Sequence, residues 1–250
     1  MRRILVLALF TLSAPAGAIV GDAPAALING RHAVMIVGSG GTFCTGAAIA
    51  RDLVLTAAHC VTPGADYKLV DHDRARQPRL LDVREVARHP KFDMQTFLNH
   101  RATADVALLK LARPLPETIV PAVLSRTMAT PKVGDRLTVL GYGVARRGDG
   151  RTGGTLRAAT LAVTGKPGNL QIRLFDRATA GKRAGLGACT GDSGAPVFTT
   201  PVPALIGVVS WSTGPDNAEG CGGLTGVTPL QLYRRWIVDT ARRLGSPLTP

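Results

Sequence analysis

The sequence predicts an all-β protein that ends in a single α-helix. Three observations point to this fold class. Short apolar segments recur along the 250 residues, clusters of Gly, Pro, Asp and Asn separate them, and a helical period emerges only near the C-terminus. The 29 Gly and 17 Pro residues favour many turns, and the 45% of hydrophobic residues can form a substantial core.

Eight segments carry the strand pattern, and turn-forming clusters such as 147–154 and 213–220 lie between strands. In chain order the predicted strands are 33–37, 53–56, 80–86, 106–111, 136–140, 156–163, 170–174 and 205–211.

The last element is predicted to be an amphipathic helix over residues 230–244. Leu232, Trp236, Ile237 and Ala241 recur at helical spacing after Pro229, and two Arg pairs lie on the polar side. We interpret it as a packing helix rather than a membrane or partner helix.

A division of the chain is predicted near residue 115. Pro114, Pro116 and Pro121 mark a linker there, and about 100 residues of β character lie on either side. The prediction is an N-terminal unit at 19–115 and a C-terminal unit at 116–250, which together form one domain.

The N-terminus has the three parts of a secretory signal peptide. Arg2 and Arg3 precede a short apolar stretch, and small residues follow it up to Ala18. The stretch is much shorter than the ~20 residues that a membrane span needs. Residues 1–18 are therefore predicted to be a signal peptide that is removed on export. Two overlapping A-x-A sites leave two alternatives for the cut, after Ala16 or after Ala18.

The net charge of +13 favours acidic partners such as nucleic acid, anionic lipid or acidic polysaccharide. The basic residues are scattered, and no aromatic residues interleave with them as in single-strand binding platforms. A solvated basic surface is the favoured interpretation, and no nucleic-acid partner is expected.

Four cysteines in an exported chain are candidates for two disulfides, of which three pairings exist. The paired C-x-x-C pattern of a structural zinc site is absent from the sequence. We predict neither a metal site nor a cofactor.

Three segments carry residues that act together in nucleophilic catalysis. His59 follows a strand in Thr-Ala-Ala-His-Cys, Asp105 opens a buried strand, and Ser193 lies in Gly-Asp-Ser-Gly. Serine needs a base to become a nucleophile, histidine has a suitable pKa, and a carboxylate can fix the tautomer of the imidazole. Backbone amides around the serine turn can bind a developing oxyanion.

In these segments the sequence resembles the trypsin/chymotrypsin family of serine proteases. The resemblance spans nearly the whole chain after residue 18, and its motifs occur in the family's order. They are Ile19-Val20-Gly21-Asp22, residues 56–60, residues 105–111, Gly141-Tyr142-Gly143, residues 191–196, Ser210-Trp211-Ser212, Gly226-Val227 and Tyr233-x-x-Trp236-Ile237.

The resemblance implies a chymotrypsin-like fold of two perpendicular six-stranded antiparallel β-barrels with the catalytic cleft between them. His59 would be the general base and then the general acid, Asp105 would orient it, and Ser193 would be acylated. The amides of Gly191 and Ser193 would form the oxyanion hole. Ser210 would support Asp105.

The resemblance also implies the activation step and the disulfides. The free amine of Ile19 would pair with Asp192 and order the oxyanion hole, and activity would fall when that amine loses its charge at alkaline pH. The disulfides would be Cys44–Cys60 and Cys189–Cys221.

By resemblance, Gly187 lies at the base of the primary pocket with Ala188 beside it. Residues 210–212 would pair with the substrate backbone, and Ser212 and Gly226 would line the pocket walls. No carboxylate is placed for Arg or Lys, so cleavage after uncharged, apolar residues is expected. An inward-facing Asp216 or Glu219 would restore a basic preference.

The predicted function is a secreted or periplasmic serine endopeptidase, monomeric, acting on proteins or peptides. The few disulfides suggest a bacterial-type member of the family. The alternative is a basic, non-catalytic binding protein on a protease scaffold that recognises anionic surfaces.

Overall fold

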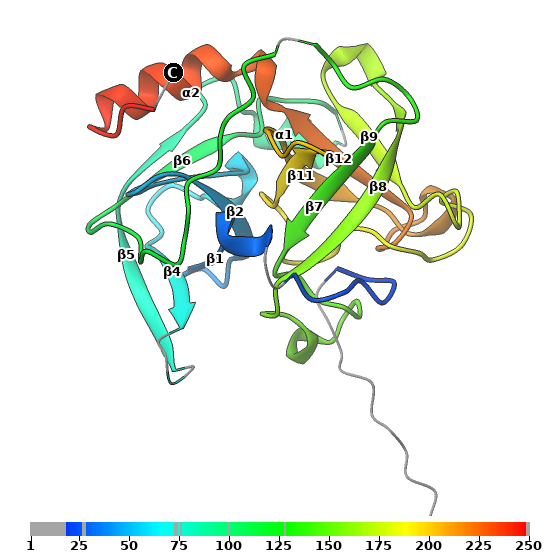
Figure 1. The fold of residues 1–250 in the computed structure, drawn as a ribbon, viewed down its shortest axis with the longest axis horizontal. Coiled ribbons are helices and arrows are strands. Elements are labelled where there is room, and N and C mark those ends of the chain that lie inside the picture. The colour runs from blue at the N-terminus through cyan, green and yellow to red at the C-terminus, as the bar shows by residue number, and fades with distance from the viewer. Residues whose placement is uncertain are drawn as a thin grey trace, which may run out of the picture.

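The fold consists of two closed antiparallel β-barrels of six strands each. It was obtained as a computed structural model that describes residues 19–26, 29–72, 75, 77–99, 101–127 and 129–248. The barrels lie side by side, one coloured blue to cyan and the other green to orange in Figure 1. The predicted fold class is therefore confirmed.

The first barrel has the strand order β1-β2-β3-β6-β5-β4. Its strands are β1 (Ala33–Gly38), β2 (Phe43–Ala50), β3 (Leu53–Thr56), β4 (Tyr67–His72), β5 (Pro78–Arg88) and β6 (Ala107–Leu111).

The second barrel has the strand order β10-β11-β12-β9-β8-β7. Its strands are β7 (Arg136–Gly141), β8 (Arg157–Gly165), β9 (Ile172–Phe175), β10 (Pro196–Thr199), β11 (Leu205–Ser212) and β12 (Leu224–Pro229).

Two α-helices and six short 3₁₀ turns complete the described chain. The helices are α1 (Met94–Leu98) and α2 (Arg234–Arg243), and the turns are η1 (Asn29–His32), η2 (Ala58–Cys60), η3 (Gly150–Thr152), η4 (Pro167–Asn169), η5 (Pro215–Asn217) and η6 (Leu230–Leu232). None of the described helices is long and apolar enough to cross a membrane.

All eight predicted strands are present within a few residues of their expected bounds, and four more strands close the barrels. The additional strands are β2, β4, β10 and β12. The last helix differs from its prediction, since residues 230–232 form a 3₁₀ turn and α2 begins only at Arg234. Leu232 is consequently exposed, whereas Ile237 and Ala241 are buried as expected.

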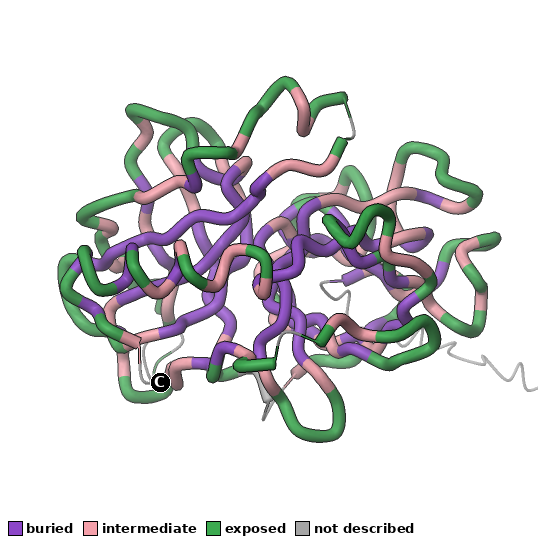
Figure 2. Tube along the Cα trace, turned by 90° about the horizontal axis from the view of Figure 1, so that it is seen from above, coloured by how far each residue is buried: buried purple, intermediate pink, exposed green. Residues whose placement is uncertain are grey.

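Three apolar clusters hold the architecture together, and Figure 2 shows the buried strands of both barrels enclosed by exposed loops. One cluster fills each barrel, and the third joins the two barrels and includes residues of α2. Strand β3 contributes to two of them, because Leu53 and Leu55 face the shared cluster while Val54 faces the first barrel's interior. This explains why β3 is apolar throughout rather than alternating.

Strand β6 ends at Leu111 and β7 begins at Arg136, so the connection between the barrels contains the division predicted near residue 115. The domain bounds themselves stay a prediction. The predicted signal peptide, residues 1–18, lies outside the described residues.

Candidate active site

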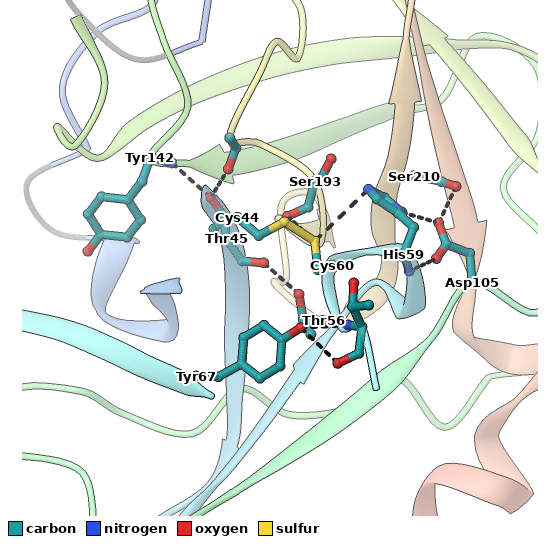
Figure 3. Close-up of a disulfide and its surroundings, with 12 residues drawn as sticks. Cys44, Thr45, Thr56, His59, Cys60, Tyr67, Asp105, Tyr142, Ser193 and Ser210 are labelled. Carbon is teal, nitrogen blue, oxygen red and sulfur yellow. Dashed lines mark hydrogen bonds and ion pairs between the residues drawn. A yellow bond between two sulfur atoms is a disulfide. The ribbon is translucent and has the colours of Figure 1, made fainter. Parts of the chain in front are cut away.

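The centre of the site is a chain of hydrogen bonds that runs from Ser210 through Asp105 to His59 (Figure 3). His59 Nδ1 lies 2.8 Å from Asp105 Oδ2, and the His59 amide donates to Oδ1 at 2.9 Å. The Ser210 hydroxyl donates to Oδ2 at 2.5 Å. Three hydrogen bonds thus fix the position of a carboxylate that is only 1% exposed.

These side chains come from three places in the chain. Turn η2 carries His59 and follows strand β3, which is buried on both faces. Asp105 lies two residues before β6, the strand that pairs with β3. Ser210 lies in β11 of the second barrel, at an irregularity in the pairing with β12. The interface of the barrels therefore assembles the group.

Ser193 lies on the far side of the His59 ring from Asp105 (Figure 3). The Cys60 sulfur is 4.0 Å from His59 Nε2 and 3.7 Å from the Ser193 carbonyl oxygen, so His59 and Ser193 both lie next to this sulfur. No hydrogen bond joins the Ser193 hydroxyl to His59 among the described residues, a common situation in sites without bound substrate.

The backbone around Ser193 requires glycine on both sides. Gly194 has a φ of +79°, and a Cβ there would lie 2.1 Å from Thr56 Oγ1. Gly191 has a φ of +95°, and a Cβ there would lie 2.4 Å from the Phe43 ring. The two glycines of the Gly-Asp-Ser-Gly motif are therefore sterically required in this turn.

The amides of Gly191 and Ser193 are the two backbone groups predicted to form the oxyanion hole. Within the described chain neither amide donates a hydrogen bond. The Val144 amide donates to the Thr190 carbonyl at 2.8 Å, which directs the Gly191 N–H to the opposite side of that planar peptide.

Asp192 is fully buried beneath this turn. Its carboxylate accepts hydrogen bonds from the amides of Gly143 at 2.8 Å and Cys189 at 2.9 Å. Burial raises the pKa of Asp192 to about 7, although both hydrogen bonds act in the opposite direction. Gly141, the last residue of β7, also lies against Asp192. A Cβ on Gly141 would be 2.0 Å from Asp192 Oδ1, so only glycine fits there.

The predicted partner of Asp192 lies inside the second barrel. Ile19 is 1% exposed and belongs to that barrel's apolar cluster, and the Val20 amide donates to the Gly187 carbonyl at 3.2 Å. Among the described residues no basic side chain pairs with Asp192.

The residues predicted for the primary pocket lie on three segments, which are residues 187–188, the end of β11 and the start of β12. A Cβ on Gly187 would lie 3.0 Å from Gly222 Cα. The Ala188 amide donates to Thr225 Oγ1 at 3.0 Å, so Thr225 in β12 holds the 187–188 segment. The Ser212 hydroxyl donates to the Gly220 carbonyl at 3.3 Å.

Trp211 and Gly226 are paired across β11 and β12. A Cβ on Gly226 would lie 2.0 Å from the indole of Trp211, so only glycine fits there.

The two carboxylates of the 213–220 loop are exposed. Glu219 is 91% exposed and forms an ion pair with Arg147 from the 143–149 segment. Asp216 is exposed at the loop's surface.

The structure contains the disulfides Cys44–Cys60 and Cys189–Cys221. The first joins β2 to the His59 turn, and the second joins the Ser193 loop to the 213–223 segment. No described group of three or more His, Cys, Asp or Glu residues is arranged to hold a metal ion.

Comparison with known proteins identifies the family of this chain. The family model described as Trypsin matches residues 19–237, most of the sequence. The chain belongs to the trypsin family. It is similar to the snake venom serine protease rhinocerase 4 of Bitis rhinoceros, with 26% identity over 95% of this chain and 93% of that protein. It is also similar to the vitellin-degrading protease of Bombyx mori, with 29% identity over 90% and 86%.

Solved structures share the fold of this chain. Human heparin binding protein matches with a TM-score of 0.69 and 25% identity, over 92% of this chain and 100% of that one. Mouse neuropsin matches with a TM-score of 0.69 and 21% identity, over 88% and 99%. These four relatives are animal proteins, and they give no support to a bacterial-type member.

Sequence reasoning missed two residues that contact the trypsin-family site. The Phe97 ring stacks on His59 with 4.4 Å between ring centroids, and it is carried by the short helix α1. The only local sequence signal for α1 is Asp93, whose carboxylate caps the helix by accepting a hydrogen bond from the Thr96 amide. The other is Thr45, whose contacts with the Ser193 loop span 146 residues of sequence and leave no local pattern.

Proposed function

We propose that this chain is an exported serine endopeptidase that cleaves peptide bonds through Ser193, His59 and Asp105. The observation that carries the proposal is the hydrogen-bonded chain of Ser210, Asp105 and His59 beside Ser193, in a chain of the trypsin family. Its substrates are proteins or peptides, and the protein acts as a secreted or periplasmic monomer.

The mechanism assigns one task to each group. His59 Nε2 takes the proton of the Ser193 hydroxyl as its oxygen attacks the carbonyl carbon of the scissile bond, and Asp105 stabilises the resulting imidazolium. The amides of Gly191 and Ser193 bind the oxyanion. When the C–N bond breaks, His59 protonates the leaving amine and an acyl-enzyme remains.

Hydrolysis of the acyl-enzyme repeats these steps with water. His59 takes a proton from the water as its oxygen attacks the ester carbon, and the proton returns to the Ser193 oxygen when the C–O bond breaks. Phe97 covers one face of the imidazole and reduces its contact with solvent.

The proposed preference is for uncharged, apolar residues before the cleaved bond. Gly187 and Ala188 bring no charge to the pocket floor, and Glu219 is engaged outside with Arg147. Ser210, Trp211 and Ser212 would align the substrate backbone, and Gly226 would keep the wall open.

Activation by a new N-terminus fits the surroundings of Asp192. A buried carboxylate whose pKa is raised by burial gains most from a nearby ammonium group. Cleavage after Ala18 would supply the amine of Ile19 directly, whereas cleavage after Ala16 would require a second cut. Protein that begins at Ile19 is expected to be active, and protein with one extra residue before Ile19 is expected to be inactive. Equal turnover by the two proteins would exclude activation by the Ile19 amine.

The decisive experiment is digestion of a mixed peptide library by protein that begins at Ile19. Ser193→Ala serves as the control. Cleavage that requires Ser193 supports the endopeptidase, and the residues before the cut sites report the pocket. Cuts after Arg or Lys would contradict the apolar preference.

A second candidate function is binding of anionic surfaces without catalysis. It is favoured by the net charge of +13 and by the likeness to human heparin binding protein. Salt-sensitive retention of the Ser193→Ala protein on heparin, together with no peptide turnover by the unmodified protein, would favour this function over the endopeptidase.

A further inference from the structure

Thr45 is a fully buried residue of β2 that hydrogen-bonds both barrels. Its main-chain amide donates to the Ser193 carbonyl at 2.9 Å, and its carbonyl accepts from Thr56 Oγ1 at 2.8 Å. Any residue could form these two bonds through its backbone. The side chain adds two further bonds of a different kind.

The Thr45 hydroxyl connects two separate segments of the second barrel (Figure 3). Its proton is donated to the Gly191 carbonyl at 2.8 Å, and its oxygen accepts the Tyr142 amide at 3.1 Å. A hydroxyl can donate and accept at once, which a valine of the same shape cannot do. Both backbone groups would lose this partner in a buried place without it.

The two connected segments are those that shape the proposed oxyanion hole. Gly191 has a positive φ and no side chain, so hydrogen bonds on either side must fix the direction of its amide. The Val144 amide fixes the preceding peptide through the Thr190 carbonyl, and the Thr45 hydroxyl fixes the following peptide through the Gly191 carbonyl. Tyr142 precedes Gly143, which donates to Asp192.

We propose that the Thr45 hydroxyl is a positioning group for the oxyanion hole: it holds the Gly191 peptide from the opposite barrel so that the Gly191 amide is aimed before substrate arrives. The inference rests on the proposed endopeptidase function. Thr45 touches no substrate atom, so its effect passes through Gly191. Such preorganised amides stabilise the charge of the transition state more than the bound substrate.

The test compares Thr45→Val, which keeps the shape and removes the hydroxyl, with Thr45→Ser, which keeps the hydroxyl. Thr160→Val is the matched control, because it removes one hydroxyl hydrogen bond, to Thr138 in the neighbouring strand of the second barrel. The readouts are kcat and KM for the best peptide of the library, and the inhibition constant of the aldehyde made from that peptide.

In the Thr45→Val protein we expect kcat to fall about tenfold to hundredfold, less than on outright loss of one oxyanion donor. KM should stay within about twofold, because ground-state binding is unaffected. Affinity for the aldehyde should fall in parallel with kcat, since its hemiacetal oxygen occupies the oxyanion hole. Thr45→Ser should restore most of the activity, and Thr160→Val should match the unmodified protein.

Unchanged kcat in Thr45→Val, or a rise in KM with no loss of aldehyde affinity, would overturn the inference. Failure of the endopeptidase function would be seen separately, as absence of cleavage by the unmodified protein. In that event native-state hydrogen exchange would test the positioning role of Thr45. Faster exchange around Tyr142 and residues 189–194 in Thr45→Val, but not in Thr160→Val, supports the positioning role, and equal exchange excludes it.

Discussion

The proposed catalytic centre and the rim of the proposed substrate pocket are held together in different ways. Asp105 is nearly inaccessible to water and receives three hydrogen bonds from His59 and Ser210. At the rim, the exposed pair of Arg147 and Glu219 links the 143–149 and 213–220 segments. The Cys189–Cys221 disulfide anchors the base of the second segment.

This difference predicts where the molecule tolerates change. In the buried centre, removal of one partner leaves polar groups unpaired and misdirects the imidazole. At the exposed rim, water replaces a lost partner and salt screens the charges. Substitutions should therefore have large effects at the centre and small effects at the rim, and the following experiments test this contrast in order of expected effect.

The largest effect is expected for Asp105→Asn. The amide would favour the wrong tautomer of His59 and could not stabilise the imidazolium, so kcat should fall on the order of 10⁴-fold. Steady-state kinetics on the best library peptide measure it, with Asp239→Asn on α2 as the exposed control. A loss of less than tenfold would show that the buried carboxylate does not orient the base.

The next effect is on stability and concerns Asp192 in protein extended before Ile19. Because its folded pKa is about 7 and the usual value is 3.8, the unfolded state releases its proton first as pH rises. Stability should therefore fall between pH 4 and 7, by roughly 4 kcal/mol, and level off above.

Urea unfolding of the extended Ser193→Ala protein at several pH values measures this fall. The same protein with Asp192→Asn should lack this contribution, so the difference between the two isolates Asp192 from the other carboxylates. Protein that begins at Ile19 should show a flatter curve because its ammonium stabilises the ionised carboxylate. Identical curves with and without the Asp192→Asn substitution would contradict the prediction.

An intermediate effect is expected for Gly226→Ala. The new methyl group would meet the Trp211 indole at 2.0 Å, so the strand that should align substrate must shift. We expect kcat/KM to fall about tenfold to hundredfold. Gly165→Ala, at a position with open space around it, is the control and should retain activity; equal behaviour of the two variants would disprove the steric argument.

The smallest effect is expected at the rim, for Arg147→Ala. Loss of the exposed ion pair with Glu219 should change kcat/KM by less than roughly fivefold, and 1 M salt should reduce the difference. A loss comparable to that of Asp105→Asn would remove the distinction between rim and centre.

Local pattern predicted the strands that are mostly aliphatic, such as β3 and β6. It missed β2, whose residues Phe43–Ala50 are rich in Ala and Gly, and the short β10, which begins with Pro196. Both receive hydrogen bonds from a strand on each side, so pairing overrides weak intrinsic preference. The five-residue helix α1 was missed because it is shorter than a periodic pattern can reveal.

The sequence by itself determined the proposed chemistry: His59, Asp105 and Ser193 lie in motifs typical of the trypsin family, and glycines mark turns where no side chain fits. Only the tertiary structure decided which groups aim and shield that chemistry. Thr45 reaches Gly191 across 146 residues, and Phe97 stacks on His59 from a separate loop. The first contact arises from the packing of the two barrels and the second from two connections of the first barrel, and neither local propensity nor spacing encodes a distance between residues so far apart in the chain.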